Sequence, residues 1–162
     1  MNAAGRGHRG GAPVGFVCDL EPVEASAVLY LRLWCEGEAS QHQTARDFDL
    51  ALGREQADEA LDALSEICGL CQRHGRRPLM RHGLSCKCVG ADEACFAHFI
   101  AAAAEGARED AMMMALLMVP SGLVPTFYGH GEIFGRALRG LARPTRRPLD
   151  ADIPLPQQVT IH

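Results

Sequence analysis

The sequence predicts an all-α protein, a compact bundle of about five helices with disordered N- and C-terminal tails. Three observations lead to this fold class. Apolar residues recur at intervals of three and four in several segments, which is the period of one helix face. Glycine or proline follows most of these segments, and no stretch alternates β-branched with polar residues as a strand would. The length of 162 residues fits one domain of this class.

The chain divides into a helical domain and two tails. Residues 1–15 hold five glycines and three alanines, so we expect a disordered tail there. Residues 143–162 contain four prolines and show no periodic apolar face, which predicts an extended Pro/Arg-rich tail. Residues 16–142 remain as a single helical domain.

The first predicted helix runs from Glu21 to about Gly37. Pro22 is tolerated in a first turn, and an acid there suits the positive end of the helix dipole. Its middle is apolar on most sides, with Arg32 as the one charge among the large apolar residues. Such a helix usually lies at the centre of a bundle. A second helix is predicted from Ser40 to Leu52.

The third predicted helix begins near Arg54 and ends before Gly75. Its acidic face consists of Asp58, Glu59, Asp62 and Glu66. Its apolar stripe consists of Ala57, Ala60, Leu61, Leu64, Ile67, Cys68 and Cys71. Because the stripe keeps helical spacing, we expect this helix to pack on the apolar first helix. Residues 83–90 are predicted to form a loop.

Three further helices are predicted after this loop. The fourth starts at Asp92 and Glu93 and ends at Gly106. The fifth starts at Glu109, and we expect its apolar residues to face the core; they are Met112, Met113, Leu116, Leu117 and Val119. A weaker helix is predicted over 133–141, after a segment rich in turn-forming residues. Short connections imply antiparallel neighbours.

Residues 68–98 concentrate the chemistry, with five of the seven cysteines and three of the seven histidines. Cys68 with Cys71, and Cys86 with Cys88, form two close pairs, and two such pairs are a usual way to supply four zinc ligands. This spacing predicts a structural Zn²⁺ site that joins the third helix to the following loop. The alternative ligands are His74, His82, Cys95 and His98.

The alternative interpretation needs no metal. Cysteine is often buried as a small hydrophobe, and Cys68, Cys71 and Cys95 lie on apolar helix stripes. Cys86 and Cys88 are instead flanked by glycines and precede a helix start, so they are candidates for an oxidisable pair. The protein would then be a metal-free protein-interaction module with buried or redox-sensitive cysteines.

The basic residues of the same segment form a candidate anion or nucleic-acid patch. Residues 67–91 carry five bases and no acid; the bases are Arg73, Arg76, Arg77, Arg81 and Lys87. The third helix would expose its acids beside any nucleic acid and repel the phosphates, so nucleic-acid binding is disfavoured. Neutralisation of this patch by acids of the same fold is the alternative.

Other function classes have no support in the sequence. The N-terminal residues lack a signal-peptide core, and the longest apolar run, residues 111–119, is too short to cross a bilayer. We therefore expect a cytoplasmic protein with reduced thiols and no membrane association. Catalytic motifs such as HExxH and Gly-rich phosphate loops are absent, so no enzyme activity is predicted.

Overall fold

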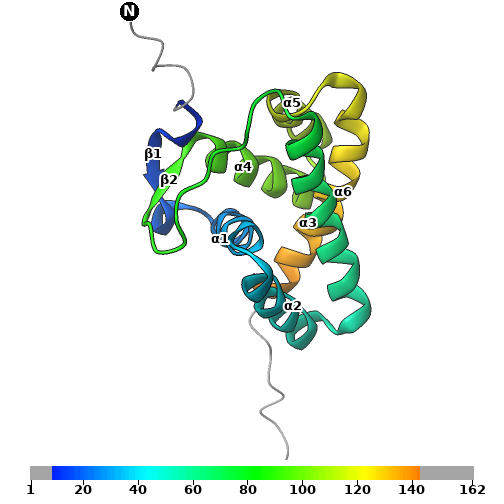
Figure 1. Cartoon of the computed structure of the whole chain (residues 1–162). Helices are drawn as coiled ribbons and strands as arrows, with labels where there is room; N and C mark the ends of the chain where they lie inside the picture. The colour runs from blue at the N-terminus through cyan, green and yellow to red at the C-terminus, as the bar shows by residue number, and fades with distance from the viewer. Residues whose placement is uncertain (1–8, 143–162) are drawn as a thin grey trace, which may run out of the picture.

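The computed structural model describes residues 9–142 and shows a mostly helical bundle, as predicted (Figure 1). It contains six helices in this part of the chain, where about five were expected. Most boundaries fall within a few residues of the predicted ones. The helices are α1 (Pro22–Glu36), α2 (Glu38–Leu52), α3 (Arg54–His74), α4 (Ala91–Glu105), α5 (Arg108–Met118) and α6 (Val124–Ala142).

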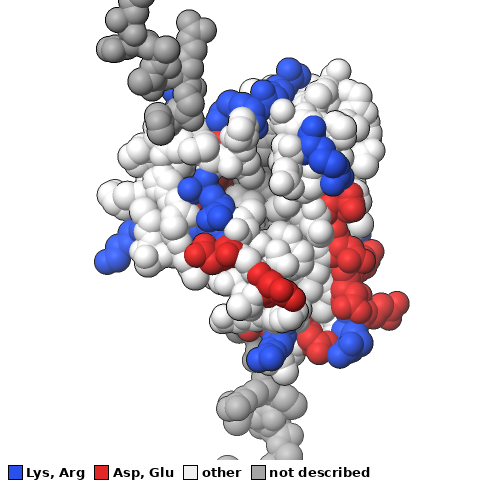
Figure 2. Space-filling model, in the orientation of Figure 1, with Lys and Arg blue, Asp and Glu red and all other residues white. Residues whose placement is uncertain are grey.

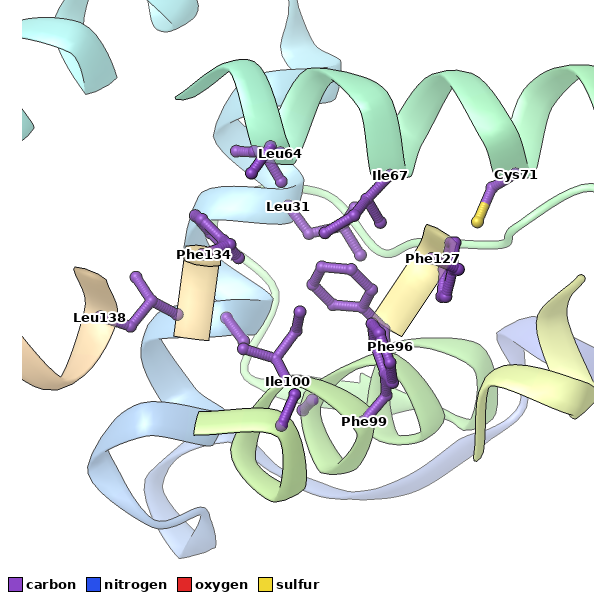
Figure 3. Close-up of a cluster of buried hydrophobic side chains, with 14 of the residues drawn as sticks. Leu31, Leu64, Ile67, Cys71, Phe96, Phe99, Ile100, Phe127, Phe134 and Leu138 are labelled. Atoms are coloured by element: carbon purple, nitrogen blue, oxygen red, sulfur yellow. The ribbon is translucent and has the colours of Figure 1, made fainter. Parts of the chain in front are cut away.

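The core lies where α1, α3, α4 and α6 meet (Figure 3). Phe96 of α4 points toward Ile67 and Leu64 of α3, and Phe134 of α6 closes one side of the cluster (Figure 3). All four side chains are fully buried. The predicted apolar stripe of α3 is therefore core, although α3 packs mainly against α6 and α2, while the expected partner α1 meets it mainly through side chains such as Leu31 (Figure 3).

Helix α6 accounts for this difference, because the sequence predicted only its second half. Its start lies in a segment with three glycines and two prolines, which were interpreted as turn residues. Pro125 is accommodated because it occupies the first turn, where no helical N–H is needed. Gly131 and Gly135 instead allow close approach: a Cβ at Gly135 would lie 2.8 Å from the carbonyl oxygen of Ile100.

Residues 9–16 are ordered, which corrects the predicted tail over 1–15. Arg9–Gly11 form a short 3-10 helix, and β1 (Pro13–Phe16) pairs antiparallel with β2 (Cys88–Gly90). The predicted loop over 83–90 correspondingly ends in a strand. All four β1 residues are exposed, so no alternating pattern marks the strand, and the pairing depends on a partner far along the chain. Residues 1–8 and the predicted tail over 143–162 lie outside the described residues.

Helix α5 buries a face made of small residues and exposes larger ones. Ala111 and Ala115 are fully buried, whereas Met113 and Leu117 are both 61% exposed. The expectation that Met113, Leu116 and Leu117 face the core is therefore wrong, since Leu116 is exposed as well. Two alanines on one face let α5 approach α4 closely, and the larger side chains are left outside.

Charged side chains are unevenly distributed over the surface. Acidic residues gather along α3, as predicted, with basic residues at its ends (Figure 2). Within residues 9–142, no helix combines the length and apolar character that a bilayer-spanning segment requires.

Candidate functional site

The connection between α3 and β2, residues 75–87, brings the cysteine-rich segment onto the helical bundle. It contains no helix or strand, so its backbone polar groups need partners elsewhere. Asp92 and Glu93, in the first turn of α4, accept hydrogen bonds from two amides of this connection. Both carboxylates are buried, at 4% and 0% exposed, although the sequence indicated only that they start a helix.

Glu93 and Arg32 form a buried ion pair at the centre of this arrangement. The Arg32 Nε donates to Glu93 Oε1 at 2.7 Å, and Nη2 donates to Oε2 at 2.8 Å. Burial alone would raise the pKa of Glu93, but hydrogen bonds from Arg32 and from the Gly90 and His82 amides outweigh it and hold that pKa below its usual value. The carboxylate is therefore charged and saturated with donors.

Arg32 also fixes the second half of the connection. Its Nη1 donates to the Cys86 carbonyl at 2.6 Å and its Nη2 to the Cys88 carbonyl at 2.7 Å. Arg32, the one charge in the apolar middle of α1, therefore holds the CxC segment (residues 86–88) against this helix. This role could not be predicted, because it depends on three groups more than 50 residues away in sequence.

Asp92 holds the first half of the connection. Its Oδ2 accepts from the Met80 amide at 2.8 Å and from Arg77 Nη1 at 2.7 Å. Arg76 reaches α5, where its Nε donates to the Leu116 carbonyl at 2.6 Å. The connection is therefore anchored on three helices, and the thiols on either side of it occupy defined positions.

One group of thiols lines an open cavity of about 800 Å³ beside this connection. Cys68 and Cys71 lie on the C-terminal half of α3, and Cys35 lies in the last turn of α1. Cys35 is exposed, Cys68 is half-buried and Cys71 is buried. The Arg81 side chain also lines this cavity, and its Nη2 donates to the Cys35 carbonyl at 2.8 Å.

The three thiols of this cavity differ in acidity. A hydrogen bond with the Cys68 thiol and the nearby Arg81 charge lower the pKa of Cys35 to about 7, against the effect of burial. The same hydrogen bond and burial raise the pKa of Cys68. Burial raises the pKa of Cys71 to about 12. Cys35 is therefore the most acidic of the three thiols.

A second thiol site lies at the other end of the connection. Cys86 Sγ is 3.4 Å from His82 Nδ1, and His82 Nε2 is 2.7 Å from the Gly11 carbonyl oxygen. Hydrogen bonds from the Cys88 amide and from His82 lower the pKa of Cys86. Burial and the nearby Cys86 raise the pKa of Cys88. The two members of the CxC motif, Cys86 and Cys88, therefore differ in acidity.

The four predicted zinc ligands fall into these two sites. Cys68 and Cys71 line the cavity with Cys35, whereas Cys86 contacts His82. Across residues 9–142, no three His, Cys, Asp or Glu side chains are grouped as a metal ion would require. The zinc site stays a prediction for which the described residues provide no ligand cluster.

The alternative zinc ligands are separated too. His98 pairs with Glu24, with 2.6 Å between Nδ1 and Oε1. The Cys95 thiol lies 3.9 Å from the Met114 carbonyl oxygen, and His74 ends α3. Among these four, His82 contacts Cys86, and Cys95 lines a smaller pocket together with Cys71.

The predicted anion patch is largely engaged within the fold. Arg77 pairs with the buried Asp92, and Arg81 Nη1 lies 3.6 Å from Glu36. Arg73 Nη2 lies 3.8 Å from Glu66 on the acidic face of α3. Arg76 donates to backbone as described above, and Lys87 lines a separate apolar pocket. These contacts agree with neutralisation of the basic segment by acids of the same fold.

Sequence reasoning missed Cys35 and the pairing of Cys86 with His82. Cys35 stands alone near the end of α1, and no spacing relates it to Cys68. His82 and Cys86 are four residues apart outside any helix, so periodicity says nothing about their contact.

Comparisons with known proteins add no constraint to these observations. No protein-family profile matches the chain, and neither curated protein sequences nor solved structures give a significant match.

Proposed function

We propose that the protein is a thiol redox switch in which Cys35 is oxidised and then forms a disulfide with Cys68. The observation that carries the proposal is the placement of an exposed, acidic thiol beside a half-buried one on the wall of an open cavity. Reactive cysteines are typically accessible, low in pKa and close to a second thiol that can resolve the oxidised form. A reducing compartment such as the cytoplasm would keep the resting state reduced.

The chemistry requires a peroxide as oxidant. The Cys35 thiolate attacks one oxygen of hydrogen peroxide, which breaks the O–O bond, gives a sulfenic acid and releases hydroxide that takes up a proton as water. The Cys68 sulfur then attacks the Cys35 sulfur, and the Cys68 proton leaves with the hydroxyl group as a second water. A dithiol reductant reverses the change by exchange.

The surroundings of Cys35 support this assignment. A helix C-terminus normally opposes a thiolate, and Cys35 lies in the last turn of α1. Arg81 counteracts this effect, because it donates to the Cys35 carbonyl and places positive charge beside the sulfur. Formation of the disulfide would tie the end of α1 to α3 and alter the cavity between them.

The proposal is tested by peptide mapping of the full chain after treatment with one equivalent of hydrogen peroxide. Trypsin places Cys35 in peptide 33–46 and both Cys68 and Cys71 in peptide 55–73, so a disulfide would join these two peptides. We expect the linked pair in the wild type and its loss in Cys68→Ser. In Cys68→Ser, dimedone should instead trap a sulfenic acid on Cys35.

Two controls make the result specific. Cys18→Ser removes another exposed thiol and should leave the linked pair unchanged. Cys71→Ser should also retain it, because Cys71 is buried and its pKa is raised to about 12, which disfavours it as the partner of Cys35. Absence of the linked pair from the oxidised wild type, its persistence in Cys68→Ser, or one equivalent of zinc in protein purified without chelator would contradict the proposal.

The pH dependence of alkylation provides a second prediction. Because the pKa of Cys35 is lowered to about 7, its rate of reaction with iodoacetamide should rise with pH through a midpoint near 7. Arg81→Gln removes a charge that favours the thiolate, so the midpoint should move to higher pH. The measurement is the alkylation rate at Cys35 from pH 5 to 10, followed by peptide mass spectrometry. A midpoint that Arg81→Gln leaves unchanged would exclude this role for Arg81.

A further inference from the structure

An apolar pocket of about 540 Å³ lies next to the second thiol site. This volume is within the range of ~300–1,000 Å³ that is typical of small-molecule sites. The residues that line it are Val17, Cys18, Val28, Leu29, Arg32, Leu84, Cys86 and Lys87. Four of these are aliphatic, two are basic and none is acidic. The pocket therefore suits an apolar chain that carries an electronegative group.

The His82 side chain is oriented to act as a base toward Cys86. The Gly11 carbonyl can only accept, so the Nε2 that faces it at 2.7 Å must carry a proton. In the neutral imidazole, Nδ1 then has a free lone pair and lies 3.4 Å from Cys86 Sγ. A thiol, a histidine and a third group that orients the histidine are the parts of an activated cysteine nucleophile.

The Cys86 thiolate has additional support from its surroundings. The Cys88 amide hydrogen-bonds to the sulfur and stabilises its negative charge. The Arg32 guanidinium is held between Glu93 and two backbone carbonyls, and it fixes Cys86 at the wall of the pocket. Lys87, also in the lining, adds positive charge near the position at which an electrophile would react.

We propose that Cys86 is a nucleophile that accepts an acyl group from apolar acyl thioesters bound in this pocket. His82 Nδ1 takes the thiol proton, and the Cys86 sulfur attacks the thioester carbonyl carbon. The bond between this carbon and the original sulfur then breaks, and His82 returns the proton to the departing thiol. The products are an S-acylated Cys86 and one free thiol, and no oxidant or other reactant is needed. The aliphatic walls select the acyl chain, while Lys87 favours the negative charge that develops on the carbonyl oxygen.

The proposal is tested by incubating the full chain with the octanoyl and acetyl thioesters of N-acetylcysteamine. Intact-protein mass spectrometry follows the adduct, and peptide mapping locates it. We expect one octanoyl group, on Cys86, formed at least ~10-fold faster than the acetyl adduct because the longer chain buries apolar surface. Cys86→Ser should abolish the adduct, and His82→Gln should slow it at least ~100-fold through loss of the base.

Matched variants separate the site from general thiol reactivity. Cys88→Ser keeps the backbone amide that contacts Cys86, so it should retain the adduct. Leu84 is 42% exposed at the pocket, so Leu84→Asp should leave the fold intact and remove the preference for octanoyl over acetyl. Far-UV circular dichroism verifies the fold of each variant. Adducts spread equally over Cys18, Cys35 and Cys86, equal rates for both thioesters, or an unimpaired His82→Gln would each overturn the proposal.

Discussion

Glu93→Ala is expected to lower the free energy of unfolding by ~3–5 kcal/mol, the usual cost of removing one partner of a buried ion pair. The Arg32 side chain is 3% exposed, so the substitution would leave its charge buried without a counterion. The amides of His82 and Gly90 would lose their acceptor at the same time. Because these groups hold the second half of the α3–β2 connection, local loosening of residues 80–90 should accompany the loss.

The measurement is urea unfolding followed by circular dichroism, with hydrogen exchange to locate the loosened segment. Glu66→Ala is the matched control, because Glu66 forms an exposed ion pair with Arg73, with 3.8 Å between charged atoms. Exposed pairs of this kind contribute ~0–1 kcal/mol. Equal effects of the two substitutions would show that the Arg32–Glu93 pair does not hold the connection in place.

The pH dependence of this contribution follows from the lowered pKa of Glu93. A group with a depressed pKa in the folded state stabilises the fold above its unfolded pKa, and the stabilisation is lost as the pH falls through the folded value. Glu93→Ala should therefore have its largest effect at neutral pH and a smaller effect in acid.

Helix positions could be predicted from the sequence where local signals agree. Helix α3 shows this best, because an apolar stripe, a glycine before Arg54 and Gly75 after His74 all mark the same element. Helix α6 could be predicted only in part, because Gly131 and Gly135 look like turn residues in sequence and are packing residues in the fold. The difference depends on Phe99 and Ile100 of α4, which approach them only after folding.

The candidate sites depend on contacts between distant segments, which explains why the sequence revealed them only in part. It identified Cys68, Cys71, Cys86 and Cys88 as the residues that carry chemistry. It paired them by spacing, whereas in the fold Cys68 lines a cavity together with Cys35 of another helix. Local spacing indicates ligands that lie within one short motif. It cannot indicate that Cys35, in the last turn of α1, lies near Cys68.

Leu64→Ala is expected to lower the free energy of unfolding by ~2–5 kcal/mol, the range for truncating a buried leucine. Leu64 of α3 is fully buried beside the aromatic cluster that includes Phe96 and Phe134 (Figure 3). The surrounding side chains belong to different helices and can close the resulting cavity only in part, so both lost burial and the cavity contribute.

The matched control for this prediction is Leu50→Ala on α2, where the leucine is 88% exposed. The same atoms are removed there, but almost no burial is lost, so the change should stay within ~0.5 kcal/mol. Urea unfolding of both variants provides the comparison. A loss below ~0.5 kcal/mol for Leu64→Ala would mean that the α3 stripe does not face the core, and the arrangement of α3 against α6 would have to be wrong. Since the same helix presents Cys68 and Cys71 to the cavity, that outcome would also remove the structural basis for pairing Cys68 with Cys35.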